Sequence, residues 1–313
     1  MQKVLVVGDV MTDIIVSPEG PLAVGSDRRA AIRMLPGGSG ANQAAWLATC
    51  GVDASFVGRV GAGDRTQQIA LLEAHGVRPV LVADRDRPTG TLVTLLSPEG
   101  ERSFFTDRGA NAALARADLP DALLDGVDLL HVSGYALFEP GPRGAVLDFI
   151  AEARRRNIRF SIDPASWSFL EEAGPENFLR WSSGASVCFP NEDEARVLAG
   201  TPDLAAQLER LSAVYPLVVI KRGALGAVAA DARGVRWSVD AASLAAIDAS
   251  GAGDAFLGGF LSLWLDGVDV ESCLRRAVEL GTRAVTILGG RPPPSASIFP
   301  PEEPDASSPD KAP

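Results

Sequence analysis

Short apolar runs alternate with helix-forming stretches along most of this chain, and this alternation constrains the fold more than any other feature. The apolar runs stop at Gly, Asp, Pro or Asn and cover residues 3–9, 54–60, 127–134, 158–164, 185–191 and 217–223. The main helical candidates are 41–50, 64–75, 141–156, 192–199 and 203–213. Strands that alternate with helices predict an α/β fold, in which a parallel sheet is covered by helices on both faces. Sheets of this kind bind ligands beyond the carboxyl ends of their strands.

Two segments depart from this pattern. Residues 11–36 and 88–108 contain no good helix, and each contains two strand-like runs. In the second segment these runs flank "SPEG", which is a hairpin signal. We expect the two segments to form a small accessory sheet, placed as a lid over the main site. The tail at 299–313 is rich in Pro, Ser and acidic residues with little to bury, so it is expected to be disordered.

Composition excludes several classes of partner. The formal net charge of −11 argues against nucleic acid and anionic membranes, because both would repel the chain. With 46% hydrophobic residues the chain can bury a large core, yet no stretch approaches the length that spans a bilayer. Three distant cysteines and no recognisable signal peptide favour reduced thiols and a cytoplasmic location.

The stretch "DASGAGDAF", which begins at Asp248, predicts an anion site. Gly251, Ala252 and Gly253 leave backbone N–H groups open to a ligand, and the apolar run that follows predicts a helix. The N-terminus of a helix favours an anion such as a transferring phosphoryl group. Asp254 in the first turn could accept a proton from an attacking hydroxyl, and the helix terminus is expected to keep this carboxylate ionised. Asp248 is too distant to share the proton and is expected to order the turn or a cation. The alternative interpretation is an Asp-capped helix after a flexible loop.

A second glycine-rich stretch, "PGGSGANQAAW", predicts contacts with a polyhydroxylated ligand. Gly37 and Gly38 would let such a ligand reach the main chain, and Asn42 offers both a donor and an acceptor to neighbouring hydroxyls. Asp13, just past the first strand, adds an acceptor from the other side. For any one of these residues, a glycine loop capped by Asn remains an alternative.

Together, "GGSGANQA" and "DASGAGDAF" resemble the two signatures of the ribokinase-like, or PfkB, carbohydrate kinases. The resemblance covers nearly the whole chain, so residues 1–298 are expected to form one kinase domain. It implies a central mostly parallel sheet, a β-sheet lid, ATP and Mg²⁺ as cofactors, and phosphorylation of a sugar hydroxymethyl group. By position, Asp254 is similar to the family's catalytic base. The N–H groups of Gly251, Ala252 and Gly253 resemble its anion hole.

The same resemblance implies substrate contacts at Asp13, Gly38 and Asn42. Ser39, which stands where ribokinases proper usually have a lysine, joins this predicted set. An unphosphorylated sugar or a nucleoside and ATP are therefore the expected partners.

Two further stretches resemble the family's nucleotide and metal sites. Asn191 and Glu194 in "PNEDEARVLAG" match its N-x-x-E pattern, which implies that Asn191 contacts the nucleotide and that Glu194 contacts Mg²⁺ through water. Lys221, Gly223 and Gly226 in "IKRGALGAV" resemble the loop that lies along ATP. Considered without the resemblance, the first stretch is an N-capped helix with an acidic first turn, and Lys221 or Arg222 is a solvated strand end.

Many ribokinase-like enzymes hold potassium next to the anion hole. The matching candidates here are Asp248 and Ser250, with the loop 284–295 facing them. A cation there would fix the N–H groups of the turn, whereas the alternative is that Asp248 only hydrogen-bonds its own turn. Exposed edges of the lid strands could pair across a homodimer.

The substrate is the least constrained feature. "DPASW" lacks the arginine of the "DPNxR" form in fructokinase-like and ketodeoxygluconate kinase-like members, and "GGSGAN" resembles some nucleoside kinases. No cluster of Lys or Arg marks a sugar-phosphate pocket in the sequence, which favours an unphosphorylated acceptor: ribose first, then a nucleoside, fructose or a related sugar.

Two other classes of function remain open. One is a nicotinamide enzyme, for which "GRVGAGD" (58–64) is an incomplete fingerprint. The other is a sugar-binding sensor without catalysis, which would have no need of a base at Asp254.

Overall fold

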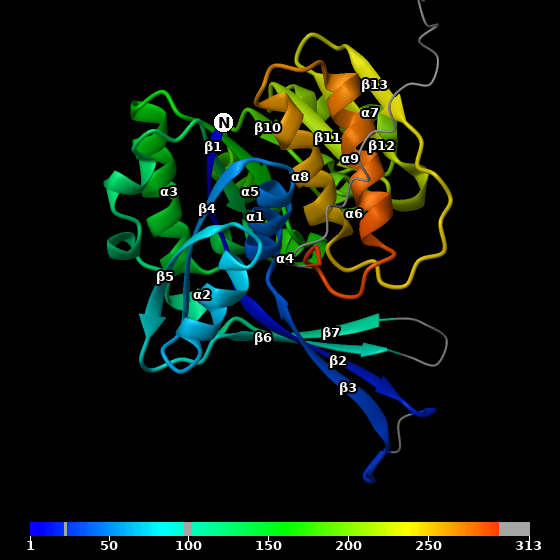
Figure 1. Ribbon diagram of the computed structural model, residues 1–313. Coiled ribbons are helices and arrows are strands. Elements are labelled where there is room, and N and C mark those ends of the chain that lie inside the picture. The colour runs from blue at the N-terminus through cyan, green and yellow to red at the C-terminus, as the bar shows by residue number, and fades with distance from the viewer. Residues whose placement is uncertain (22–23, 97–101, 294–313) are drawn as a thin grey trace, which may run out of the picture.

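A nine-stranded sheet forms the body of the computed structural model, which describes residues 1–21, 24–96 and 102–293 (Figure 1). The strand order is β13-β12-β11-β10-β9-β8-β1-β4-β5. The strands are β1 (Lys3–Val7), β4 (Asp53–Gly61), β5 (Arg78–Asp84), β8 (Leu129–Ser133), β9 (Arg159–Asp163), β10 (Val187–Cys188), β11 (Leu217–Lys221), β12 (Ala227–Asp231) and β13 (Arg236–Val239). The pairs β11–β12 and β12–β13 are antiparallel, and the other pairs of this sheet are parallel. The predicted mostly parallel sheet is confirmed.

Helices cover both faces of this sheet, and each face has its own apolar core. One face carries α3 (Pro140–Arg155), α4 (Trp167–Ala173), α5 (Pro175–Trp181), α6 (Glu192–Ala199) and α7 (Leu204–Ser212). The other carries α1 (Ser39–Thr49), α2 (Arg65–Glu73), α8 (Ala252–Trp264) and α9 (Val270–Ala284). Successive side chains of a strand point to opposite faces. Leu5 and Val7 therefore enter the first core, while Val4 and Val6 enter the second, which is why β1 is apolar throughout.

The predicted strands and helices occur in the structure within two residues of their expected ends, except at β10. That strand was expected over 185–191 but covers only Val187–Cys188. It ends early because Pro190 has no N–H with which to continue the ladder. The sequence analysis missed six elements, namely β5, β12, β13, α4, α5 and α9. β12, β13, α4 and α5 are short, whereas β5 contains an apolar run and α9 has apolar residues at helical spacing, so these two could have been found.

A separate four-stranded sheet confirms the predicted small accessory sheet. Its order is β3-β2-β6-β7, formed by β2 (Met11–Pro18), β3 (Ala30–Gly37), β6 (Gly90–Leu96) and β7 (Arg102–Asp107). The central pair β2–β6 is parallel and the two outer pairs are antiparallel. Figure 1 shows this sheet as an arm that extends away from the large sheet. The expected hairpin turn at 97–100 and the tail at 299–313 lie outside the described residues.

The three cysteines form no disulfide, as expected of reduced thiols. Cys188 and Cys273 are buried, and Cys50 is half-buried. In the ranges that the structure describes, no helix combines the length and the apolar character needed to cross a lipid bilayer.

Candidate active site

Two adjoining cavities open at the carboxyl ends of the strands. The first, called here the helix cavity, has a volume of about 550 Å³ and lies between the 223–226 loop, the segment 241–249 and helices α8 and α9. The second, called the sheet cavity, has a volume of about 830 Å³ and lies between the small sheet, α1 and the N-terminus of α8. Asn191, Lys221 and Gly253 line both cavities. Two ligands bound in them would therefore meet at this point.

Nearly all of the residues predicted for the site line one of these two cavities. The helix cavity is lined by Asn191, Lys221, Gly223, Gly226, Ala252 and Gly253. The sheet cavity is lined by Asp13, Gly38, Ser39, Asn42, Asn191, Glu194, Lys221, Ser250, Gly251, Gly253 and Asp254. Asp248 lines neither cavity, and nor does any residue of the incomplete dinucleotide fingerprint at 58–64.

The N-terminus of α8 lies at the junction of the cavities. Gly251, which precedes the helix, has a φ of 73°, and a Cβ atom there would lie 2.3 Å from the carbonyl oxygen of Gly290. Only glycine fits this position without strain. The first N–H groups of an α-helix have no partner within it, and the N–H of Ala252 makes only a long 3.4 Å bond to the Ala249 carbonyl. This end of α8 can therefore bind an anion through backbone N–H groups.

Asp254, in the first turn of α8, is held by two side chains of α1. The Ser39 hydroxyl donates to its Oδ1 at 2.9 Å, and the Asn42 amide donates to its Oδ2 at 3.2 Å. Both side chains were predicted as substrate contacts, and the structure shows that they also position the predicted base. A carboxylate that accepts two hydrogen bonds still has lone pairs left for a ligand hydroxyl.

The pKa of Asp254 is raised to about 8. The main cause is loss of water around the carboxylate, followed by the negative charge of Asp163. The hydrogen bonds from Ser39 and Asn42 and the charge of Lys221 oppose the rise without cancelling it. The prediction that Asp254 stays ionised is therefore wrong near neutral pH, because desolvation and the charge of Asp163 raise its pKa by more than the two hydrogen bonds and Lys221 lower it.

Asp13, from β2, faces the sheet cavity with an unpaired acceptor. Its Oδ1 is buried and has no hydrogen-bond partner among the described residues. A Cβ atom on Gly37 would lie 2.1 Å from this oxygen, so the bare backbone of Gly37 makes room for Asp13. Burial and the charge of Asp9 raise the pKa of Asp13 to about 7, although Arg291 lowers it. A buried acceptor without a donor is suited to a ligand hydroxyl.

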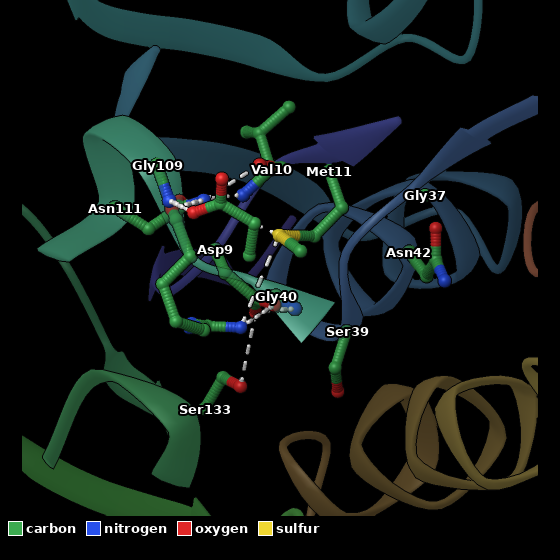
Figure 2. Close-up of polar contacts among 12 residues, drawn as sticks. Asp9, Val10, Met11, Gly37, Ser39, Gly40, Asn42, Gly109, Asn111 and Ser133 are labelled. Carbon is green, nitrogen blue, oxygen red and sulfur yellow. Dashed lines mark hydrogen bonds and ion pairs between the residues drawn. The ribbon is translucent and has the colours of Figure 1, made fainter. Parts of the chain in front are cut away.

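Sequence analysis missed Asp9, which lines the sheet cavity. Figure 2 shows its polar contacts. Its carboxylate accepts a hydrogen bond from the N–H of Gly40 at 3.0 Å and pairs with Arg108 at 3.1 Å. The Ser133 hydroxyl adds a longer bond of 3.4 Å. The signal that could have found Asp9 is its place directly after β1, two residues beyond the last residue of that strand.

Asn191 and Glu194 form a reciprocal cap at the start of α6. The Asn191 side chain accepts from the Glu194 N–H at 2.9 Å, and both carboxylate oxygens of Glu194 accept from Asn191, at 2.8 and 2.7 Å. Burial raises the pKa of Glu194, while nearby Lys221 lowers it. The N-cap interpretation and the site interpretation are therefore both compatible with the geometry, since the same pair also lines the sheet cavity.

Lys221 lies between the two cavities and pairs with Asp163, a residue that sequence analysis did not select. The Lys221 ammonium lies 2.6 Å from the Asp163 carboxylate, and both side chains are largely buried. Desolvation alone would lower the pKa of Lys221, but the charges of Asp163 and Glu194 raise it. The interpretation of Lys221 as a solvated strand end is therefore wrong.

Asp248 holds the turn before α8 against the loop after α9. Its two carboxylate oxygens accept from the N–H groups of Ser250 and Gly289, each at 2.9 Å. The N–H groups of Ile247 and Asp248 both donate to the Val285 carbonyl, at 2.7 and 3.0 Å. The prediction that Asp248 orders its turn agrees with these contacts.

Comparison with known proteins matches most of this chain to one family. The model for "pfkB family carbohydrate kinase" matches residues 1–296. Among curated relatives, the bifunctional protein HldE of Shewanella sp. (strain MR-4) is 29% identical over 92% of this chain. This chain spans only 60% of that protein's length. The ATP-dependent ribose-1-phosphate kinase of Halopiger xanaduensis is 28% identical over 95% of this chain and 96% of its own.

Solved structures share the fold. Adenosine kinase from Sinorhizobium meliloti superposes with a TM-score of 0.82 at 23% identity, covering 93% of this chain and 96% of its own. The protein designated Ribokinase II from E. coli, in complex with ATP and Mg²⁺, superposes with a TM-score of 0.81 at 23% identity, covering 93% and 94% of the two chains.

The close approach of Gly251 to Gly290 generates a stability prediction. Gly251→Ala adds a Cβ against a backbone carbonyl in a left-handed conformation. Gly267 has a φ of 78°, and a Cβ atom there would meet nothing within 4 Å. Gly267→Ala is therefore the matched control, since it carries the cost of the left-handed backbone without a steric clash. We expect Gly267→Ala to lower the free energy of unfolding by about 1–2 kcal/mol and Gly251→Ala to lower it further. Urea unfolding of the three proteins measures this difference, and equal losses in the two variants would show that the clash is relieved at no cost.

Proposed function

Because the chain belongs to the pfkB family of carbohydrate kinases, we propose that it transfers the γ-phosphoryl group of Mg-ATP to a hydroxymethyl group of a ribose-like sugar. The observation that carries this proposal is the meeting of two cavities at Gly253, beside the carboxylate of Asp254. Phosphoryl transfer requires a donor and an acceptor on either side of one phosphorus atom, with a base next to the acceptor hydroxyl.

The helix cavity is the proposed nucleotide site. Apolar side chains of Phe256, Val278 and Val285 line it, and these suit a planar base. Gly223 and Gly226 leave its edge open to a ribose and phosphates. A nucleotide that lies along this wall would place its terminal phosphate at the N-terminus of α8. The similar fold of the Ribokinase II solved with ATP and Mg²⁺ supports this assignment.

Mg²⁺ fits the site as an ion that ATP carries. Within the described ranges, no group of three or more His, Cys, Asp or Glu residues could hold a metal alone. Both oxygens of Glu194 already accept hydrogen bonds, and Asp163 is paired with Lys221. Since Mg²⁺ keeps several waters, Glu194 and Asp163 would contact it through water. When bound, the ion would neutralise charge on the phosphates.

In the proposed reaction the acceptor oxygen forms a bond to the γ-phosphorus while the bond between that phosphorus and the bridging oxygen of ADP breaks. The hydroxyl proton passes to the carboxylate of Asp254. The raised pKa of Asp254 makes its ionised form a stronger base than an ordinary aspartate. The N–H groups at the start of α8 and the ammonium of Lys221 stabilise negative charge on the phosphoryl oxygens.

The sheet cavity is the proposed sugar site, with Asp13, Gly38, Ser39 and Asn42 around the hydroxyls. Two relatives support an acceptor with a ribose unit, since one is named for ribose 1-phosphate and another for adenosine; the acceptor in the first name is phosphorylated and that in the second is not. Of the two cations that line the cavity, Arg108 is paired with Asp9, and Lys221 lies at the junction where the transferring phosphoryl group would sit. Neither cation is left for a phosphate group on the acceptor, which favours an unphosphorylated acceptor.

A nucleoside is the second candidate, and a third cavity favours it. This cavity has a volume of about 370 Å³ and shares Arg108, Tyr135 and Phe169 with the sheet cavity. Phe138 and Trp181 add further aromatic surface to it. A sugar in the sheet cavity could therefore extend a planar substituent into aromatic surroundings.

The small sheet is the proposed lid and also the proposed surface for a homodimer. Ile32, Met34, Phe104 and Phe105 are large apolar side chains that it leaves 58–69% exposed. Exposed apolar strands of this kind favour association with a second copy.

The direct test of the function is release of ADP, measured with a coupled assay over pentoses, hexoses, nucleosides and their phosphates. Turnover with ribose or a nucleoside supports the proposal. Turnover only with phosphorylated sugars would overturn the assignment of an unphosphorylated acceptor, and no turnover across the panel would overturn the proposed function.

Asp254→Asn tests the base. The substitution keeps the size of the side chain and removes its ability to take a proton, so kcat should fall by roughly 10²–10⁴-fold. Nucleotide affinity should change little, which calorimetry can check. A kcat within a few-fold of the parent would remove Asp254 from the mechanism.

The raised pKa of Asp13 leads us to expect that sugar affinity depends on pH. Hydroxyl groups donate to the ionised carboxylate, so binding should weaken as the pH falls through the pKa of about 7. Well below the pKa, the loss approaches about tenfold per pH unit. Calorimetry in an Asp254→Asn background measures this dependence without the titration of Asp254, and comparison with Asp13→Asn separates Asp13 from Glu194, whose pKa is also raised. Asp13→Asn should bind weakly and without the pH dependence, whereas a pH-independent affinity in the Asp13 protein would contradict the role.

Potassium next to Asp248 and Ser250 is part of the proposal. A cation there would hold the turn before α8 and add positive potential where charge develops. Turnover in sodium- and potassium-free Tris buffer should rise as KCl is added and should not respond to matched choline chloride. A flat response would show that the bonds of Asp248 to Ser250 and Gly289 order the turn without a metal.

A further inference from the structure

A chain of hydrogen bonds runs from the core of the large sheet to Asp254. The Ser161 hydroxyl lies 2.8 Å from Nδ1 of His131, and Nε2 of His131 lies 3.0 Å from Oε1 of Gln43. The Gln43 amide donates to the Ser39 hydroxyl at 2.9 Å, and Ser39 donates to Asp254 at 2.9 Å. Ser161, His131 and Gln43 are fully buried. Sheet strands β9 and β8 are thereby connected to α1 and α8 by polar side chains alone.

The order of donors and acceptors in this chain follows from its two ends. When Asp254 is ionised, as it must be to act as the base, its carboxylate only accepts hydrogen bonds, so Ser39 uses its single hydrogen on Asp254 and must accept from Gln43. Gln43 then presents its carbonyl oxygen to His131, which must carry its hydrogen on Nε2. Nδ1 of that neutral ring accepts from Ser161, whose position opposite His131 is fixed by the pairing of β8 with β9. Each side chain in this series therefore determines whether the next one donates or accepts.

His131 is suited to this role because it stays neutral. Burial, with a smaller contribution from Lys221, lowers its pKa to about 3. A ring that does not titrate at working pH keeps one donor and one acceptor. Gln43 is likewise uncharged. The hydrogen bonds therefore fix which group donates and which accepts, without placing a charge next to Asp254.

We propose that Gln43 and His131 are positioning residues that hold the Ser39 hydroxyl as a donor to the ionised carboxylate of Asp254. Without Gln43, the hydroxyl is free to rotate, since a serine at the start of a helix can turn to backbone groups instead. The inference deepens the proposed function and rests on Asp254 as the base. It also gives Ser39, where ribokinases proper have lysine, a role toward the base.

Other charged groups around Asp254 are unchanged by a substitution at Gln43. They are Asp163 on β9, Lys221 on β11 and Arg291 after α9. A change in the titration of Asp254 on substitution of Gln43 therefore reports the hydrogen-bond chain. Because the Ser39 bond lowers the pKa of Asp254, its loss should raise that pKa.

The test is a pH titration of the full-length protein labelled with ¹³C at aspartate carboxyl carbons, with the Asp254 signal identified by its absence from Asp254→Asn. Gln43→Met should raise the pKa of Asp254 by about one unit, and Ser39→Ala should do the same or more. Ser39→Thr, which keeps the hydroxyl, should restore the parent value. Gln207→Met is the control, since Gln207 is equally buried in α7 and lines neither cavity.

The acid limb of kcat/KM should move to higher pH by the same amount, with the KM for ATP unchanged. If Gln43→Met does not fold, Gln43→Leu serves instead, because it also removes the amide that donates to Ser39 and adds no charge near Asp254. An unchanged Asp254 titration in a folded Gln43 variant overturns the inference. The carboxyl titration needs no substrate, so a failure of the proposed kinase activity in the acceptor panel is recognised separately.

Discussion

The hydrogen bonds from Ser39 and Asn42 to Asp254 join two helix N-termini whose residues are 215 and 212 positions apart in the sequence. These bonds require α1 and α8 to pack closely. Gly258 permits that contact, since a Cβ atom there would lie 2.8 Å from Cβ of Trp46. The Trp46 indole in turn donates to the Gly290 carbonyl at 2.9 Å. The same packing therefore places Asp254 as the proposed base, the N-terminus of α8 and the loop after α9 in one fixed arrangement.

Crowding of carboxylates sets the electrostatics of the site. Asp9, Asp13, Asp163, Glu194 and Asp254 all line the sheet cavity. Desolvation and mutual repulsion raise the pKa of Asp13 and of Asp254 toward or above neutrality. The cations in this region mainly neutralise these acids. A neutral acceptor rich in hydroxyl donors suits such surroundings better than a second anion, whereas the phosphates of ATP would lie at the N-terminus of α8 beside Lys221 in the proposed arrangement.

Local patterns made much of the fold and many of the site positions predictable. The apolar period placed β1, β4 and β11, and the Gly-rich turn before α8 indicated both the helix start and the neighbourhood of Asp254. The two glycine-rich stretches indicated residues that do line the cavities. The exposed β13 lacks an apolar run that would identify it, whereas β5 contains one between Arg78 and Asp84 and could have been found.

What sequence could not supply is pairing across long separations. Asp163 meets Lys221 only because β9 and β11 flank β10, and Arg108 reaches Asp9 from the end of the small sheet. The sign of the Asp254 shift also needed the structure, since desolvation depends on the surrounding packing and not on the helix position that the motif reveals.

The central claim is that a donor in the helix cavity and an acceptor in the sheet cavity meet at the N-terminus of α8. A crystal structure with Mg²⁺ and a non-hydrolysable ATP analogue tests it most directly and needs no knowledge of the sugar. The account predicts that the adenine ring lies among Phe256, Val278 and Val285. It predicts that the terminal phosphate lies against the N–H of Gly253, on the side that faces Asp254. A nucleotide bound elsewhere, or one whose terminal phosphate points away from Asp254, would contradict it.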